Sequence, residues 1–293
     1  MEIIVPENAA AFLERMQPEL EAHEAANSLM YGLTLRIIND PGWAKIPPLY
    51  WIAVQEDDKG GAVRAAALIT PPHNLVLFSS PDESPPEAYE AIATNIWERG
   101  IALPGLFGPV AATRAFIQAW QALSGQQARL LMHQRLFELR QVIAPTWPQG
   151  QMRKARESDI PLLSDWFLEF HYDSDPTGSP PPDAQQLREL TADRVEKGIF
   201  FVWEDGQPVC MAGINRPTPH GWTIGPVHTP RPLRCRGYAT ALTAALSQYV
   251  LDAGKQFVTL DTDLANPTSN SIYQKVGFKP VIDLDMLEFY TPA

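Results

Sequence analysis

The sequence reads WTIGPVHT at residues 222–229 and RCRGYA at residues 234–239, and this stretch decides the fold of the second half of the chain. The first segment predicts a strand, and residues 240–250 place apolar side chains at helical spacing, which predicts a helix that stops near Gly254. Gly237 therefore falls at a helix N-terminus, where its missing Cβ lets a ligand approach the backbone closely. The first N–H groups of a helix have no acceptor within it, so this turn favours an anion.

Three arginines surround the turn, Arg231, Arg234 and Arg236, in a chain whose formal net charge is -11. A cationic cluster against an acidic background indicates a bound polyanion. The R-x-x-G-x-A pattern alone is found before many helices. Its position between a strand, a long helix and a second strand makes it informative, and it predicts a backbone site for a pyrophosphate.

A second segment with clear signals follows at residues 257–278. FVTLDT at residues 257–262 predicts a strand, Asn266 is a good N-cap, Pro267 suits the first helical position, and Gly277 predicts the end of the helix. The alternative is an ordinary capped helix with a tyrosine in the core. One face of this helix carries two amides and a phenol, at Asn266, Asn270 and Tyr273.

Residues 222–278 resemble motifs A and B of the GNAT N-acetyltransferase superfamily. The pyrophosphate loop of that family, Q/R-x-x-G-x-G/A, is matched by residues 234–239. Cys235 departs from the pattern, because many members carry a second glycine there. The later Asn, Tyr and Gly-Phe of the family are matched by Asn266, Asn270, Tyr273, Gly277 and Phe278.

The resemblance implies how acetyl-CoA, the acyl donor, would be held. The backbone of Val227, His228 and Thr229 would meet the pantetheine arm and the thioester carbonyl, where the fourth strand of the sheet splays from the fifth. The amides that would cradle the pyrophosphate are those of Arg234, Cys235, Arg236, Gly237, Tyr238, Ala239 and Thr240.

On the same resemblance, Asn266 and Asn270 would hydrogen-bond the pantetheine end and Tyr273 would stand near the sulfur as the general acid. A phenol has an unperturbed pKa of about 10, near the ~8.5 of a thiol. Tyr273 can therefore protonate a departing thiolate and stay neutral at rest. A backbone N–H of His228 or Thr229 can stabilise the oxyanion.

An alkylammonium acceptor must first lose a proton, and the sequence leaves the base open among several side chains and a water chain. Each candidate side chain could equally be a solvated or hydrogen-bonded polar group. The candidates are His228, Glu169, His171 and Asp261.

The segment after the first helix of this half borders the acceptor in the family, and here it is rich in acids and aromatics. Glu169, Asp173 and Asp175 could hold a cationic amine, and Phe170 and Tyr172 could pack against its apolar part. The alternative is a loop of solvated acids.

Composition narrows the class of protein. The 293 residues suffice for two domains, and 45% hydrophobic with 19% charged residues is typical of a soluble globular chain. No apolar run reaches the ~18–20 residues of a membrane span, and the first residues lack the features of a signal peptide. Two cysteines, Cys210 and Cys235, argue against a disulfide framework, and the scattered histidines give no metal pattern.

These features predict a reduced cytoplasmic protein without a metal. The pI near 5.0 argues against nucleic acid as the main partner. The expected partner is an amine acceptor, which is a small molecule or a peptide. The chain itself would be a monomer or a homodimer.

A linker near residues 142–150, with two prolines and a glycine, predicts domains at residues 1–145 and 146–293. The second half reads β-α-α-β-β-β-α-β-α-β-β, which is the order of the family. The first half reads in the same order, which predicts an internal duplication. The expected fold is α/β: two tandem GNAT-like domains, each with a twisted, mostly antiparallel sheet flanked by helices and splayed between its fourth and fifth strands.

The first half differs at the residues that would bind the donor. SSPDESPP at residues 79–86 has two acids and neither Gly nor Arg, so an anion would be repelled, and no Asn–Tyr pair follows Phe107. This half is predicted to be a degenerate GNAT-like domain that supports the other; an unrelated domain is the alternative. The helices expected here are residues 7–38, with a break at 24–28, and residues 86–99 and 110–123. The strands expected here are residues 49–55 and 62–69, around a turn at 57–61, and residues 74–78, 102–107, 129–132 and 137–142.

The leading functional hypothesis is an N-acetyltransferase that uses acetyl-CoA and acts on a primary amine. A non-catalytic acyl-CoA-binding or sensor protein with the same fold is the alternative. A dinucleotide-binding Rossmann domain is disfavoured, since it requires G-x-G-x-x-G after an early strand, and only Gly237 stands in this loop.

Overall fold

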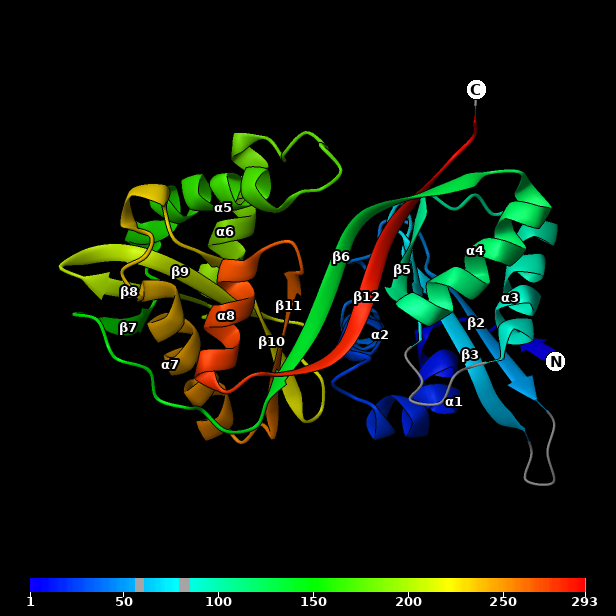
Figure 1. The fold of residues 1–293 in the computed structure, drawn as a ribbon, viewed down its shortest axis with the longest axis horizontal. Coiled ribbons are helices and arrows are strands. Elements are labelled where there is room, and N and C mark those ends of the chain that lie inside the picture. The colour runs from blue at the N-terminus through cyan, green and yellow to red at the C-terminus, as the bar shows by residue number, and fades with distance from the viewer. Residues whose placement is uncertain (56–60, 79–84, 293) are drawn as a thin grey trace. The chain divides into compact units, whose positions relative to one another are not determined.

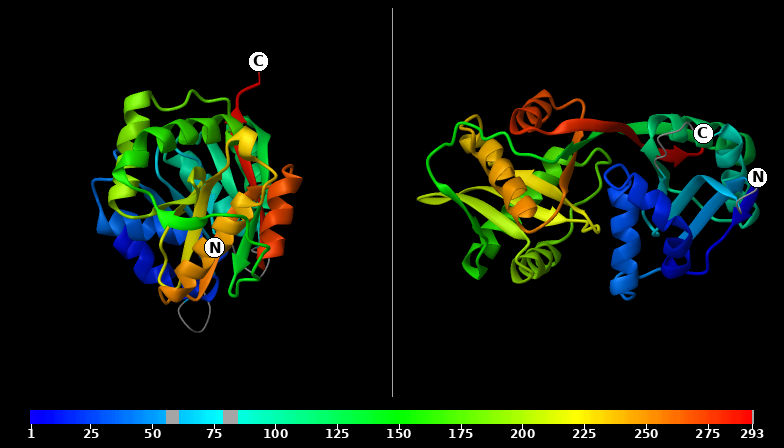
Figure 2. Two further views of the ribbon diagram at one scale, coloured as in Figure 1. Left: turned by 90° about the vertical axis from the view of Figure 1, so that its left-hand side faces the viewer. Right: turned by 90° about the horizontal axis from the view of Figure 1, so that it is seen from below.

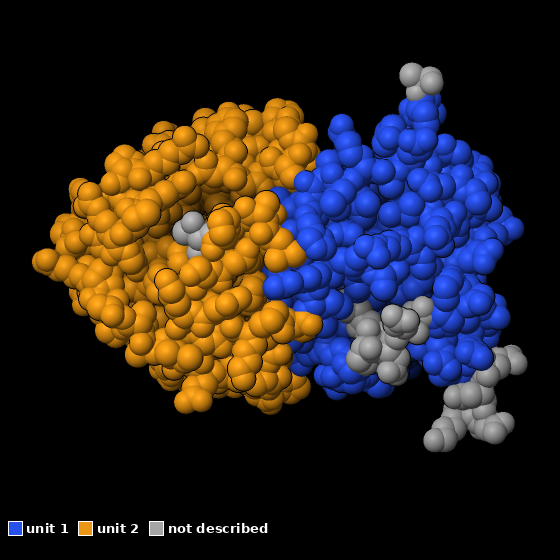
Figure 3. Space-filling view, viewed as in Figure 1, with its two compact units in different colours: residues 1–136, 282–293 blue, residues 137–281 orange. Residues whose placement is uncertain are grey.

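The computed structural model describes residues 1–55, 61–78 and 85–292. The chain forms two compact units (Figure 3): unit 1 contains Met1–Leu136 and Ile282–Ala293, and unit 2 contains Phe137–Val281. The division expected from the sequence, 1–145 and 146–293, stays a prediction about functional domains. No helix in the described part of the chain is both long and apolar enough to cross a membrane.

Unit 2 follows the element order expected from the sequence up to its last helix (Figure 1). Its sheet has the order β6-β11-β10-β9-β8-β7, with β10 and β11 parallel and the pairs β9–β10, β8–β9 and β7–β8 antiparallel. The elements are β7 (Gln151–Lys154), a 3-10 turn (Glu157–Asp159), α5 (Ile160–Ser174), α6 (Ala184–Glu196), β8 (Phe200–Asp205), β9 (Gln207–Asn215), β10 (Gly221–His228), a 3-10 turn (Arg231–Leu233), α7 (Tyr238–Asp252), β11 (Phe257–Asp263) and α8 (Pro267–Val276).

Both faces of this sheet are apolar, because alternate side chains of a strand point to opposite sides. On β8, Phe201 and Trp203 join the core under α7 and α8, while Phe200 and Val202 join the core under α5. Figure 2 shows helices on both faces of the sheet. The sheet is therefore a buried middle layer, and only its strand ends are free to carry chemistry.

The expected splay between the fourth and fifth strands of unit 2 is present. β10 and β11 pair from Gly221 with Phe257 to Thr223 with Thr259, but β10 runs on to His228. A β-bulge against β9 lies between Ile224 and Val227, and bulges bend a strand and increase its twist. The C-terminal end of β10 thus leaves the parallel ladder.

Unit 1 has the same frame, and two of its segments from the sequence analysis, the turn at 57–61 and the loop at 79–86, lie largely outside the described residues. Its sheet order is β1-β2-β3-β4-β5-β12-β6, with β4 and β5 parallel. The elements are β1 (Glu2–Ile4), α1 (Ala9–Ala22), α2 (Ser28–Asn39), β2 (Leu49–Gln55), β3 (Ala62–Ile69), β4 (Leu75–Leu77), α3 (Pro86–Glu98), β5 (Gly105–Pro109), α4 (Val110–Ser124), β6 (Gln127–Leu139) and β12 (Lys279–Tyr290).

The last strand of the chain completes the sheet of unit 1. β12 pairs antiparallel with β5, from Leu284 with Pro109 to Glu288 with Gly105. A Cβ on Gly105 would lie 2.1 Å from the carbonyl oxygen of Leu287, so only glycine allows this approach. Leu287 and Phe289 are buried in the same core as Phe116 and Trp120 of α4. Unit 1 is therefore built from both ends of the sequence.

The prediction of two short closing strands in each half is wrong. Residues 129–132 and 137–142 are not separate strands, because β6 runs unbroken from Gln127 to Leu139. The second half likewise closes with the single strand β12. Neither Gly nor Pro interrupts β6, and polar residues along it have partners on β12, such as Arg135 with Asp283 at 2.6 Å. The short strand β1 stands where the shared order begins with a strand, although the sequence analysis assigned no residues to it.

Candidate active site

The turn before α7 is open. Gly237 is the N-cap of α7 with φ +83°, a left-handed conformation that favours glycine, and no side chain caps the helix. A Cβ built on Gly237 meets no atom within 4 Å. The amides of the first turn, from Tyr238 to Thr240, therefore begin a helix at an exposed loop, which is the arrangement that binds phosphate groups.

The backbone conformation of Cys235 explains why glycine suits this position in the family pattern. It adopts φ +63° and is one of two non-glycine residues with positive φ in the described part of the chain, the other being Arg216. A side chain in this conformation costs roughly 1–2 kcal/mol. The Cys235 thiol is exposed, so the backbone turn survives the substitution with some strain.

Two of the three loop arginines are held by an acid from α5. Asp173 accepts from Arg231 at 2.8 Å and from Arg234 at 2.5 Å. These hydrogen bonds from Arg231 and Arg234 hold the pKa of the Asp173 carboxyl below its usual range. Arg234 also donates to the carbonyl of Thr229 at 2.9 Å. The structure thus places Asp173, which the sequence analysis assigned to the acceptor side, against the loop before α7 that is predicted to bind the donor.

Helix α8 presents an unused acceptor atom. The Nδ2 of Asn270 donates to the carbonyl of Asn266 at 2.9 Å and to that of Asp263 at 3.2 Å, which fixes the amide. Its Oδ1 is buried and makes no hydrogen bond in the described structure. Buried acceptors are usually satisfied, and an amide N–H of a pantetheine arm would fit here. The residues present therefore suit the donor that the sequence predicts.

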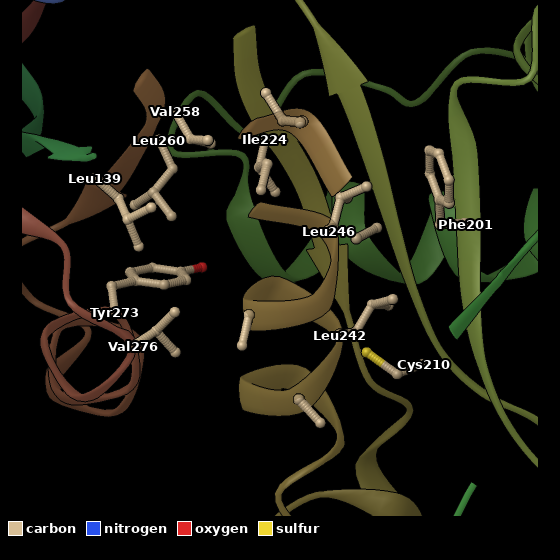
Figure 4. Close-up of a cluster of buried hydrophobic side chains, with 14 of the residues drawn as sticks. Leu139, Phe201, Cys210, Ile224, Leu242, Leu246, Val258, Leu260, Tyr273 and Val276 are labelled. Atoms are coloured by element: carbon tan, nitrogen blue, oxygen red, sulfur yellow. The ribbon is translucent and has the colours of Figure 1, made fainter. Parts of the chain in front are cut away.

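Tyr273 lies in the core on the inner face of α8. Only 9% of the residue is exposed. Its ring lies among Leu139, Leu260 and Val276, and its hydroxyl points towards α7 (Figure 4). The ring also contacts Phe278 with centroids 6.0 Å apart. The phenol can protonate a thiolate only if the sulfur reaches its hydroxyl, so the acid role stays a prediction.

His228 ends β10 beyond the parallel ladder and contacts α5. Its Nε2 lies 3.0 Å from Oε2 of Glu169, and its ring centroid is 6.5 Å from that of Trp166. Only 4% of His228 is exposed. Burial lowers the pKa of His228 below its ordinary value although the Glu169 carboxylate raises it. The imidazole is therefore neutral at pH 7.

The neighbours of His228 on the strand end are also engaged. Val227 and His228 pair with Ala212 and Met211 of β9. The hydroxyl of Thr229 donates to Sγ of Cys210 at 3.1 Å. Burial raises the pKa of the Cys210 thiol to about 12, so Cys210 is an inert core group.

The remaining acceptor-side residues are dispersed. Phe170 packs in the core under α5, and Tyr172 is 68% exposed. Asp175 accepts from the backbone N–H groups of Thr177 and Ser179 at 3.0 and 2.8 Å. These contacts order the segment after α5. The structure brings Glu169 and Asp173, one helical turn apart, to the strand end and the arginines. Their i, i+4 spacing indicates a shared helix face, but it does not identify the partners.

Comparison with known proteins shows which family and which structures this chain resembles. Residues 160–278 match the model of the acetyltransferase (GNAT) family. No curated protein matches the chain significantly. A Drosophila protein of known structure is similar with a TM-score of 0.63 at 13% identity, over 100% of this chain and 99% of that one.

Two further structures align over nearly the whole chain. A GCN5-related N-acetyltransferase from Sphaerobacter thermophilus has a TM-score of 0.61 at 15% identity, over 99% of this chain and 96% of that one. A tandem GNAT protein from the clavulanic acid biosynthesis pathway has a TM-score of 0.55 at 14% identity, over 99% and 98%. At these identities the likeness shows the fold, which extends over both units.

Proposed function

We propose that this chain transfers an acetyl group from acetyl-CoA to a primary amine of a small molecule or peptide, because residues 160–278 match the model of the acetyltransferase (GNAT) family. The observation that carries the proposal is the open N-terminus of α7, where Gly237 stands with nothing within 4 Å of its Cβ position.

The donor side would be built from backbone and cations. The amides from Arg234 to Thr240 would take the pyrophosphate, with the helix dipole of α7 behind them. Arg236 donates a long bond, 3.4 Å, to the carbonyl of Pro232 and also hydrogen-bonds Tyr238; its exposed side chain would turn from these contacts to a phosphate. Oδ1 of Asn270 would accept from the pantetheine. Acetyl-CoA, when bound, supplies the acyl group as a thioester.

Backbone and side-chain groups of the protein would then take part in the transfer of the acetyl group. A backbone N–H at His228 or Thr229 would stabilise the oxyanion, since both lie where β10 leaves the ladder. Tyr273 would return a proton to the leaving thiolate. The amine would attack directly, because no covalent enzyme intermediate is needed when donor and acceptor are held together.

A non-catalytic acyl-CoA-binding or sensor protein is the second candidate. The burial of Tyr273, 9% exposed, favours it to the extent that the phenol serves only the core. The two candidates differ in turnover and not in binding.

A thiol-release assay separates them. The full chain is incubated with acetyl-CoA and a panel of primary amines and peptides, and free thiol is followed together with the mass of the products. The enzyme hypothesis predicts release of thiol that matches the acetylated amine. Binding of acetyl-CoA by calorimetry with no release above the uncatalysed rate across the panel would favour the sensor.

A further inference from the structure

The four candidate bases from the sequence differ in what they contact. Asp261 is paired with Arg216, so its charge is already balanced by a cation. His171 has its Nε2 3.0 Å from the carbonyl of Ser179, within the loop that it orders. His228 and Glu169 remain, and the structure joins them in one hydrogen bond.

That hydrogen bond fixes the state of the imidazole. A carboxylate can only accept, so Nε2 of a neutral His228 carries the proton that it donates to Glu169 across 3.0 Å. Nδ1 is then left with the lone pair. A carboxylate behind an imidazole holds the tautomer and stabilises the cation that forms on proton uptake.

We propose that His228 is the base that takes the proton from the acceptor amine, and that Glu169 is the positioning residue that holds it in the required tautomer. This assignment rests on the proposed function and names the acceptor class: amines that are protonated at neutral pH. An alkylammonium has no lone pair for attack, so such a substrate needs a base before the C–N bond can form.

The charges around His228 suit a base. Glu169 and Asp173 face it from α5 and raise its pKa, while Arg234 faces it from the loop before α7 and lowers it together with burial. The net shift is downward, and the imidazole is free to accept a proton at pH 7. Trp166 packs beside the ring without adding charge.

The proton balance is complete without another reactant. Nδ1 of His228 takes one proton from the ammonium, directly or through a water. The amine nitrogen forms the C–N bond and the C–S bond breaks. Tyr273 gives its proton to the departing thiolate, and the second proton that leaves the nitrogen restores the phenol, directly or through solvent. The imidazolium of His228 returns its proton to solvent.

Two acceptors test the assignment in one variant, His228→Gln, which keeps the backbone N–H. With an alkylamine at pH 7, kcat/KM should fall by about 100-fold, the lower range for a lost general base, and should recover as the pH rises towards the pKa of the amine. With an alkoxyamine, which is neutral at pH 7, the loss should be under about 5-fold, because little proton transfer is needed before attack. His73→Gln, an exposed histidine of unit 1, is the matched control and should leave both rates unchanged.

The positioning role of Glu169 can be tested without measuring enzyme turnover. Nitrogen NMR of the unliganded chain should show His228 as the Nε2–H tautomer. In Glu169→Gln the pKa of His228 should fall further, because the carboxylate raises it, and the alkylamine rate should drop less than in His228→Gln. Calorimetric affinity for CoA should stay unchanged in both variants.

Equal losses with both acceptors, or an unchanged alkylamine rate in His228→Gln, would overturn the assignment. So would an Nδ1–H tautomer in the unliganded chain. Absence of turnover in the wild-type chain would overturn the proposed function itself, and the NMR measurement tests the His228–Glu169 arrangement independently of it.

Discussion

Helices α7 of unit 2 and α3 of unit 1 follow corresponding strands, β10 and β4, yet their first turns are chemically opposite. α7 begins at Gly237 with no side-chain cap, behind exposed arginines. α3 begins at Pro86, after Pro85, with Glu87 in its first turn. Proline removes an N–H donor and an acid already complements the helix dipole. The same arrangement of strands and helices can thus favour or disfavour anion binding, depending on a few residues at a helix N-terminus.

The second helix of each unit repeats the contrast. Counted from the first residue of each helix, Phe116 of α4 takes the place of Tyr273 of α8, and Thr113 takes the place of Asn270. Phe116 is fully buried. Unit 1 keeps the aromatic ring that packing needs and lacks the hydroxyl that the proposed acid role of Tyr273 requires. If that role holds, a single oxygen atom separates a packing residue from a catalytic one.

The largest expected effect comes from closing the open helix terminus. Gly237→Glu puts a carboxylate where the pyrophosphate would lie, and we expect the Kd for CoA to rise by at least about 1,000-fold, which is about 4 kcal/mol. Isothermal titration calorimetry measures this. Gly254→Glu is the matched control, because Gly254 has φ +91° and open space at the other end of α7. Equal losses in the two variants would point to backbone strain and against the loop.

A core substitution should separate stability from binding. Phe289→Ala removes a ring whose centroid lies 5.9 Å from that of Trp120 in unit 1. We expect a loss of about 3 kcal/mol in the free energy of unfolding of unit 1, measured by hydrogen exchange of the β5 amides, with CoA affinity unchanged. Tyr290→Ala, at a residue that is 41% exposed, should cost under about 0.5 kcal/mol. A matching loss of CoA affinity would show that the donor site depends on unit 1.

Tyr273→Phe gives α8 the ring that α4 carries at the corresponding position, Phe116. Removal of a general acid lowers kcat by about 100-fold or more, while the ring keeps its packing against Phe278. We therefore expect lower kcat, unchanged affinity for acetyl-CoA and little loss of stability, from steady-state kinetics and thermal unfolding. An unchanged kcat would leave Tyr273 with a packing role only.

The smallest effect is expected at the strained residue of the loop. Cys235→Gly relieves a side chain at φ +63°, and the gain is offset in part by the freedom of glycine in the unfolded chain. We expect a stabilisation of about 0.5–1 kcal/mol, measured by chemical denaturation, with CoA still bound. Destabilisation would mean that the Cys235 side chain has a contact worth more than its strain.

The sequence predicted what local signals encode. Gly237, Asn266 and Gly277 mark helix ends, and the structure has α7 starting after Gly237 and α8 spanning the residues between Asn266 and Gly277. The long-range contacts carried no such signal. Asp173 meets arginines that lie 58 and 61 positions further along the chain, and only the packing of α5 on the strand end brings them together.

The prediction of two short closing strands failed for a related reason. Residues 127–139 contain no glycine or proline, and the alternation of polar and apolar residues is irregular there. The absence of Gly and Pro permits one long strand, but no local feature indicates that β12 will pair with β5 of unit 1, because a strand partner distant in sequence leaves no periodicity of its own. A tandem repeat makes this harder, since each half offers the same edges.

The stoichiometry of donor binding tests the central claim most directly. Calorimetric titration of the full chain with acetyl-CoA should give one site per chain, because the amides before α7 can hold a pyrophosphate and the Pro85–Glu87 terminus of α3 cannot. Two sites per chain, or one site that persists in Gly237→Glu, would contradict the account.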